Sequence, residues 1–143
     1  MGGTDNGPVR GGDGYSVDLG RDPAEVEAVR AAIRRMAMEG RFADRAHDLE
    51  LAFAEIVANA QEHGRPPVRV RAWLDGRLVV EVTDAGAGFD PGELVPDRPP
   101  SHAGHRGRGL WIARQLVDVM DVRASPTGTT VRLELSPEPH IGA

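Results

Sequence analysis

Lysine and cysteine are both absent from this chain of 143 residues. Without lysine every basic side chain is an arginine, so the Walker A loop, which places a lysine at the phosphates of a nucleotide, is excluded. Without cysteine there are no disulfides, thiolate nucleophiles or cysteine-based zinc sites. No apolar run is long enough to cross a membrane, and the N-terminus carries glycines and charges where a signal peptide needs an apolar segment. We therefore expect a cytoplasmic protein that does not bind membranes.

Length and composition indicate one ordinary globular domain. A chain of this length can bury a sizeable core, and 40% hydrophobic with 27% charged residues is typical of globular proteins. The net charge of -5 argues against direct binding of nucleic acid. Residues 1–14 are rich in glycine and polar residues and are expected to form a disordered arm. The folded domain is assigned to residues 15–136, and residues 137–143 to a disordered tail.

Hydrophobic periodicity and turn residues predict the element order β-α-α-β-β-loop-α-β-β. This order favours an α+β fold, with a mixed, mostly antiparallel sheet covered on one face by helices. The last helix is expected to begin at Gly107 and to keep its inner side as far as Met120. The predicted strands are residues 15–19, 68–72, 78–83, 122–125 and 129–135, and the predicted helices are residues 22–40, 49–64 and 107 onward.

Residues at the helix ends give further expectations. Asp22 is predicted to cap the first helix, Glu25 to reach back to the residues before it, and Gly40 to end it. Asp44 or Asp48 is predicted to cap the second helix.

Asp75-Gly76 lies between two segments of alternating apolar residues, which predicts a hairpin. A loop of two residues would pair Val70 with Glu81 and mix the two faces of the sheet. A loop of three residues with a bulge would place the apolar residues of both strands side by side and an arginine beside Glu81. We predict the odd-length loop.

The helix at residues 49–64 carries a polar ridge beside its apolar face, which is predicted to consist of Leu49, Phe53, Ile56, Val57 and Ala60. Glu55, Asn59 and His63 follow one another at four-residue steps, about 100° from the centre of the apolar face. A carboxylate and an amide one turn apart suit a site for a metal ion and phosphate. Solvated polar residues on a surface helix would give the same pattern. For His63 we favour a hydrogen-bonding or surface role over a catalytic one.

Two glycine-containing segments add to this ridge. Asp84 follows a strand and precedes Gly86 and Gly88, which allow the backbone to approach a flat ligand, and a carboxylate can accept from an amino group such as adenine N6. Gly107 and Gly109 stand at a helix start, where free N–H groups favour phosphate. Each segment alone is also common as a plain turn or helix start.

Together these motifs resemble the GHKL ATPase superfamily of gyrase, Hsp90, histidine kinases and MutL. Within it, they resemble the small stand-alone anti-sigma factor serine/threonine kinases. The resemblance runs from about Tyr15 to Leu135. The N box is matched by residues 55–64, the first glycine box by residues 84–89, the second by residues 107–110 with its continuation to 118, and a closing Gly-Thr segment by residues 128–131.

The resemblance implies a Bergerat-type α/β sandwich with a flexible ATP lid at Asp90–Gly104. Asn59 would hold Mg²⁺, Glu55 would be the catalytic base, and Asp84 with Thr130 would read adenine. Arg106 or Arg108 would stand in for a lysine at the phosphates, and the choice between them is open. The implied cofactors are ATP and Mg²⁺, and the further candidate cofactor-binding residues are His63, Gly86, Gly88, Phe89, Arg106, Gly107, Arg108, Gly109 and Leu110.

The resemblance also implies partners. The substrate would be a serine or threonine of a STAS-domain anti-sigma factor antagonist, and the same domain would hold a sigma factor, usually as a homodimer. A sensor histidine kinase is not expected, because no dimerisation helix with a phospho-accepting histidine precedes the ATPase segment.

Two other functions compete with this kinase. The first is an ATP-binding regulatory module with little or no kinase activity, against which the presence of Glu55 argues. The second is a methyltransferase, whose strand and glycine-rich turn Asp84 to Gly88 would also suit. That fold needs alternating strands and helices after the glycines, whereas here a long loop, one helix and two strands follow.

Overall fold

The computed structural model describes residues 14–86 and 105–137, with the backbone alone for residues 105–108. The predicted lid at residues 90–104 and nearly all of the predicted arm and tail lie outside the described residues. The described elements are β1 (Tyr15–Leu19), α1 (Pro23–Glu39), the 3-10 helix η1 (Ala43–Arg45), α2 (Ala46–His63), β2 (Val68–Leu74), β3 (Leu78–Asp84), α4 (His105–Leu116), β4 (Val119–Ser125) and β5 (Gly128–Leu135).

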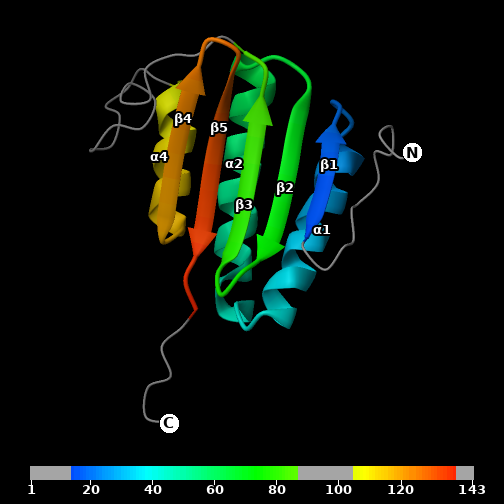
Figure 1. Cartoon of the computed structure of the whole chain (residues 1–143), viewed down its shortest axis with the longest axis vertical. Coiled ribbons are helices and arrows are strands. Elements are labelled where there is room, and N and C mark those ends of the chain that lie inside the picture. The colour runs from blue at the N-terminus through cyan, green and yellow to red at the C-terminus, as the bar shows by residue number, and fades with distance from the viewer. Residues whose placement is uncertain (1–13, 87–104, 138–143) are drawn as a thin grey trace.

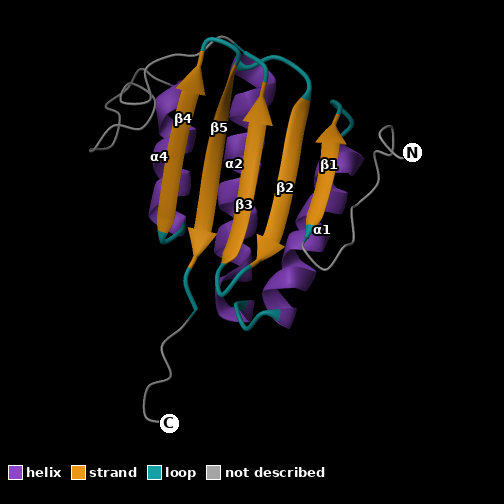
Figure 2. Ribbon diagram, viewed as in Figure 1, coloured by secondary structure: helices purple, strands orange, loops and turns teal. Residues whose placement is uncertain are grey.

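The five strands form one sheet in the order β1-β2-β3-β5-β4, and every neighbouring pair is antiparallel. Helices α1, α2 and α4 lie together on one face of the sheet, and no described element covers the other face (Figures 1 and 2). The α+β sandwich is therefore confirmed, with an antiparallel sheet in the described residues. This sheet does not fit a methyltransferase, which needs alternating strands and helices after its glycines.

Helix α2 is the centre of the helical layer and lies behind the middle strands (Figure 1). Its predicted apolar face is confirmed, because all five of its residues are buried. They pack with the inward residues of the sheet, which alternate along each strand with residues of the open face. The apolar face of α2 consists of Leu49, Phe53, Ile56, Val57 and Ala60.

The ends of α1 follow the sequence closely. Asp22 is its N-cap and accepts a hydrogen bond from Ala24 N at 2.9 Å. Glu25 reaches back as expected, and its Oε1 accepts from Gly20 N at 2.7 Å. Gly40 is the C-cap, and its N–H donates to Met36 O.

The start of α2 differs from the expectation. Neither Asp44 nor Asp48 caps it: the N-cap position is Arg45, and no side chain makes a capping hydrogen bond. The physical reason is that η1 runs directly into α2, so Asp44 already lies inside a helical turn. Asp48 falls in the first turn of α2 and lies 3.5 Å from the guanidinium of Arg45.

Two boundaries in the C-terminal half also differ. Helix α4 begins at His105, two residues before the predicted start. Strand β4 begins at Val119, three residues early, because Val119, Met120 and Asp121 pair with β5. Met120 therefore belongs to a strand rather than to the inner side of the helix, although it still packs against the core. Periodicity failed here because an edge strand is only partly buried.

The hairpin of β2 and β3 confirms the parity argument. Leu74 pairs with Leu78, which leaves a loop of three residues, and Arg71 pairs with Glu81. Gly76 has φ +67°, a conformation that favours glycine, and Asp75 N donates to Arg77 O at 2.8 Å.

Among the described helices, none is both long and apolar enough to pass through a bilayer.

Candidate functional site

Glu55 and Asn59 lie half-buried on α2, and His63 is exposed in its last turn. Among the described residues, Glu62 Oε1 lies 3.7 Å from His63 Nε2. Since one helical turn separates Glu55 from Asn59, their side chains point in nearly the same direction. The polar ridge therefore lies beside the core and is partly open to solvent.

Gly109 of α4 lies directly against Glu55. A Cβ built at Gly109 would lie 2.9 Å from Glu55 Oε1 and 3.9 Å from Glu55 Cβ. The next residue, Leu110, is fully buried in the core and anchors this part of α4. The absence of a side chain at Gly109 thus leaves room for the carboxylate at the contact between α2 and α4.

Asp84, at the end of β3, faces the helical layer. It shares the parity of the buried Val80 and Val82 and is only 8% exposed. Its Oδ1 accepts a hydrogen bond from Gly86 N at 2.7 Å. Within residues 14–86 and 105–137 no hydrogen bond to its Oδ2 is formed, so this oxygen is available as an acceptor.

The end of α2 is held against Asp84. A Cβ built at Gly64 would lie 2.4 Å from Asp84 Cγ and 2.6 Å from Oδ1. Beside this contact Ala85 N donates to Arg65 O at 2.8 Å. The last turn of α2, which follows Asn59 by one turn, and the carboxylate of Asp84 therefore occupy the same end of the sandwich.

Thr129, rather than Thr130, stands beside Asp84. In the register of β3 and β5, Asp84 pairs with Thr129. Thr129 is 5% exposed, and its Oγ1 is buried with no hydrogen-bond partner in the described chain. Thr130 faces the open side of the sheet, where its hydroxyl lies 3.0 Å from that of Thr83.

The structure thus does not bring Thr130 together with Asp84, and it reveals a candidate that the motif comparison missed. The strand pattern contained the signal. Thr129 has the same parity as the inward residues Val131, Leu133 and Leu135, whereas Thr130 has the opposite parity. A buried hydroxyl without a partner is unfavourable unless a ligand or water completes it.

Several candidate residues cannot be placed fully. Gly88 and Phe89 lie outside the described residues. Arg106, Gly107 and Arg108 belong to the first turn of α4, but their side chains are likewise outside the description. The described residues contain no group of three or more His, Cys, Asp or Glu side chains that could hold a metal.

Comparison with known sequences decides the family. The family described as "Histidine kinase-like ATPase domain" matches residues 19–135, most of the chain. The chain belongs to this family. This ATPase domain is also 40% identical over 83 residues to "Sensor protein CseC" of Streptomyces avermitilis. The match covers 52% of the chain and 16% of that protein, so the chain spans a small part of its curated relative.

Solved structures share the fold of this ATPase domain. The RsbU and RsbW domains of Rv1364c from Mycobacterium tuberculosis match with a TM-score of 0.58 and 22% identity, over 86% of this chain and 31% of that one. The mycobacterial sensor histidine kinase MprB matches with a TM-score of 0.52 and 23% identity, over 87% and 99%. These identities establish the fold alone. Membership in the family implies that the domain binds ATP and supports kinase chemistry in general.

Proposed function

We propose that this chain is an ATP-binding anti-sigma factor with protein serine/threonine kinase activity. It phosphorylates a STAS-type antagonist and sequesters a sigma factor in a bacterial partner switch. The observation that carries the proposal is the position of Glu55. Its carboxylate lies against Gly109 of α4, and Glu55 precedes Asn59 by about one turn of α2. The likeness of the fold to a chain that contains an RsbW domain supports it.

The adenine end of the site is assigned to Asp84 and Thr129. The Oδ2 of Asp84, which accepts no hydrogen bond from the described residues, would accept one from the exocyclic amino group, and the hydroxyl of Thr129 would donate or accept a second one. Both groups are buried at the same end of the sheet, and Thr129 Oγ1 lacks a partner in the described chain. We therefore assign to Thr129 the role that the family resemblance gave to Thr130.

The phosphate end is assigned to Asn59 and the start of α4. The half-buried amide oxygen of Asn59 fits the oxygen ligands that Mg²⁺ prefers, and the ion would neutralise charge on the phosphates. Gly107, in the first turn of α4, would bind the phosphates through its backbone N–H, and Arg106 or Arg108 would add positive charge. Gly109 and Leu110 lie past the free N–H groups of the helix start, so Gly109 would leave room beside Glu55 and Leu110 would anchor the helix. His63 would keep a hydrogen-bonding role, and Gly88 and Phe89 are proposed as further nucleotide-binding residues from the family resemblance alone.

Glu55 is the catalytic base of the proposed transfer. Its carboxylate accepts the proton of the substrate serine or threonine hydroxyl, and the hydroxyl oxygen forms a bond to the γ-phosphorus. The bond between the γ-phosphorus and the β–γ bridging oxygen breaks, and ADP leaves. We further propose that residues 15–136 are the catalytic domain of a cytoplasmic homodimer.

A trans-phosphorylation assay tests this function. The protein is incubated with Mg-ATP and candidate STAS proteins, and the modified residue is identified by mass spectrometry and by its stability in acid. Phosphoserine or phosphothreonine survives acid, whereas phosphohistidine does not. Acid-stable transfer to a STAS protein supports the proposal. Transfer only to histidine refutes it, and nucleotide binding without transfer leaves the ATP-binding regulatory module as the function.

A further inference from the structure

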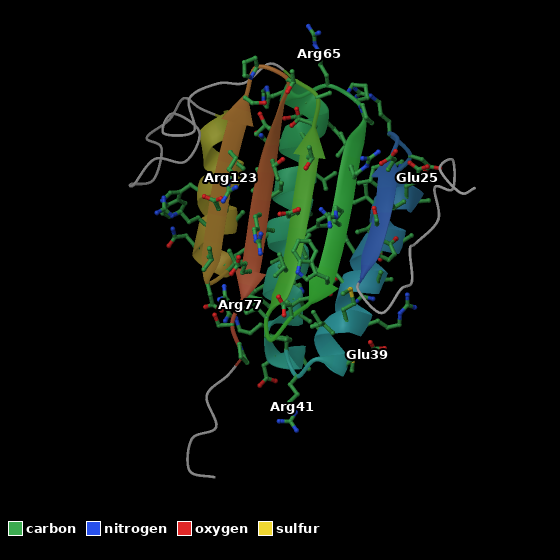
Figure 3. All side chains as sticks on the ribbon, viewed as in Figure 1. Glu25, Glu39, Arg41, Arg65, Arg77 and Arg123 are labelled. Carbon is green, nitrogen blue, oxygen red and sulfur yellow. The ribbon has the colours of Figure 1, made fainter. Side chains whose placement is uncertain are left out.

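The segment Leu116–Asp118, which continues the second glycine box, has no part in the proposed reaction. It forms the end of α4 and the turn into β4. Its backbone lies beside the end of β5, because Asp118 N donates to Glu134 O at 3.0 Å. In Figure 3 this is the lower end of the molecule, which Arg77 marks, since Arg77 pairs with Glu134. Arg65, next to the end of α2, marks the opposite end.

Arg45 binds this segment from the start of α2. Its Nη2 donates to Leu116 O at 3.0 Å, and its Nη1 lies 3.4 Å from each carboxylate oxygen of Asp118. Leu116 is the last residue of α4, and the last four carbonyl groups of a helix have no partner within it. A cation at the C-terminus of a helix also has the favourable sign for the helix dipole. Arg45 therefore completes the end of α4 from a position 71 residues earlier in the chain.

Asp118 connects the same contact to the sheet. Its Oδ2 accepts a hydrogen bond at 2.8 Å from the N–H of Ser136, the residue that directly follows β5. The side chains of Arg45 and Asp118 thus join the start of α2, the end of α4 and the end of β5. We call these two side chains, together with the carbonyl of Leu116, the α4 clasp.

Arg45 is an unfavourable residue for its own helix. It occupies the N-cap position of α2, where no side chain makes a capping hydrogen bond and where a cation meets the positive end of the helix dipole. Asp48 in the first turn offsets part of this charge, 3.5 Å from Arg45 Nε. The gain from an arginine at this position therefore lies in its contacts with α4.

The clasp holds the helix that lies against the proposed catalytic base. Gly109 and Leu116 are seven residues apart, or about 10 Å along α4. At Gly109 a Cβ would lie 2.9 Å from Glu55 Oε1, so the fit between α4 and this carboxylate leaves little room for displacement. Because a short helix moves as a rigid element, a shift of its end also displaces Gly109. A misplacement of about 1 Å can slow catalysis by as much as 10²-fold.

We propose that Arg45 is a positioning residue for phosphate transfer. By holding the end of α4 against the start of α2 and the end of β5, it fixes α4 along its axis and keeps Gly109 beside the Glu55 carboxylate. The inference rests on the proposed kinase function. It adds a residue that lies outside the matched motifs and acts from the far end of α4.

Arg45→Met is the test substitution, because methionine keeps an unbranched apolar stem but has neither charge nor N–H donors. The variant should fold, since Leu110 of α4 remains fully buried in the core. The matched control is Arg77→Met, which removes an arginine from the same end of the molecule. Its ion pair with Glu134 joins the hairpin loop to β5 instead of joining α2 to α4, and Glu134 keeps Arg132 as a partner at 2.8 Å.

Three measurements separate position from stability. Hydrogen exchange followed by mass spectrometry reports the opening of α4, single-turnover kinetics with a STAS protein gives the rate of phosphate transfer, and calorimetry gives the affinity for ADP. We expect the amides of α4 in Arg45→Met to exchange about five- to tenfold faster. Phosphate transfer should slow about tenfold, which is more than the loss of affinity for ADP. Arg45→Lys should recover part of both losses, because an ammonium group donates to Leu116 O but lacks the planar fork that also reaches Asp118.

Arg77→Met should leave both the exchange of α4 and the transfer rate unchanged. A lower melting temperature of Arg45→Met with an unchanged transfer rate would mean that the clasp only stabilises the fold, and would overturn the proposal. Unchanged exchange in α4, or equal effects in Arg77→Met, would overturn it as well. If the parent protein transfers no phosphate, the proposed function and the role in transfer fail together, whereas the exchange measurement still decides whether the clasp holds α4.

Discussion

Gly64→Ala is the substitution that tests most directly how α2 holds Asp84. Gly64 has φ -93° and ψ -163°, a backbone conformation that alanine also adopts. The new Cβ would lie 2.4 Å from Asp84 Cγ, 2.6 Å from Oδ1 and 2.7 Å from Ala60 O, against ordinary contacts of 3.4–4 Å. The position therefore needs glycine for space alone, and the structure must shift by about 1 Å.

The size of the effect follows from what has to move. The carbonyl of Ala60 belongs to the hydrogen bond that closes α2, so the displacement falls mainly on Asp84. Overpacking of this kind costs about 1–3 kcal/mol, which lowers the melting temperature by about 4 °C per kcal/mol and leaves the domain folded. Loss of the hydrogen bond from adenine to the carboxylate costs about 1.5–3 kcal/mol of binding, or roughly 10- to 150-fold in Kd.

Isothermal titration calorimetry with ADP and Mg²⁺ measures the affinity, and circular dichroism measures the melting temperature. Gly20→Ala is the control, because its Cβ would meet only the mobile tip of Glu25, at 3.0 Å. We expect Gly20→Ala to bind ADP like the parent protein. A double-mutant cycle with Asp84→Asn separates the two effects, because the affinity losses should not add if Gly64 acts through Asp84.

Wild-type affinity in Gly64→Ala, with the expected fall in melting temperature, would refute this reasoning. It would mean that the carboxylate can move without harm to the nucleotide. Fully additive losses in the cycle would instead show that Gly64 affects binding by another route.

The other predictions concern single residues of the same site. Thr129→Val should weaken ADP binding about tenfold without lowering the melting temperature, because it removes a buried hydroxyl that has no hydrogen-bond partner among the described residues. Thr130→Val should leave the affinity unchanged. The reverse pattern in calorimetry would return the adenine contact to Thr130. Asn59→Ala should abolish binding of ATP with Mg²⁺. Glu55→Ala should still bind ATP but transfer phosphate to a STAS protein about 10²–10⁴-fold more slowly. Equal loss of nucleotide affinity in both variants would contradict their separate roles. Gly109→Ala should displace the Glu55 carboxylate and reduce the rate of phosphate transfer more than the affinity for ADP. Single-turnover kinetics measures the rate and calorimetry the affinity. An unchanged transfer rate would show that the contact between Gly109 and Glu55 has no part in the mechanism.

Much of the fold was predictable because it rests on local patterns. The 3.6-residue period placed the buried face of α2 and the polar ridge beside it, and Asp22 and Gly40 marked the ends of α1. Strand parity was enough to choose the three-residue hairpin loop. These features depend on neighbours within a few residues along the chain, which is the range that a sequence pattern reports.

The helix starts were less predictable because they depend on what precedes them. A capping residue is effective only where the chain enters the helix from an extended conformation, and η1 removes that condition at Asp44. Strand β4 was shortened in the prediction because its first residues pair with β5 at an edge, where alternation is weak.

The sequence by itself determined that Glu55 and Asn59 share one side of a helix and that Asp84 follows a strand next to glycines. Only the tertiary structure decided that Thr129, from a strand 45 residues further along the chain, pairs with Asp84, and that Gly64 packs against the same carboxylate. The physical reason is that periodicity sets the direction of a side chain within its own element. The register between strands, and the space left between a helix end and a strand end, arise only when distant segments pack together.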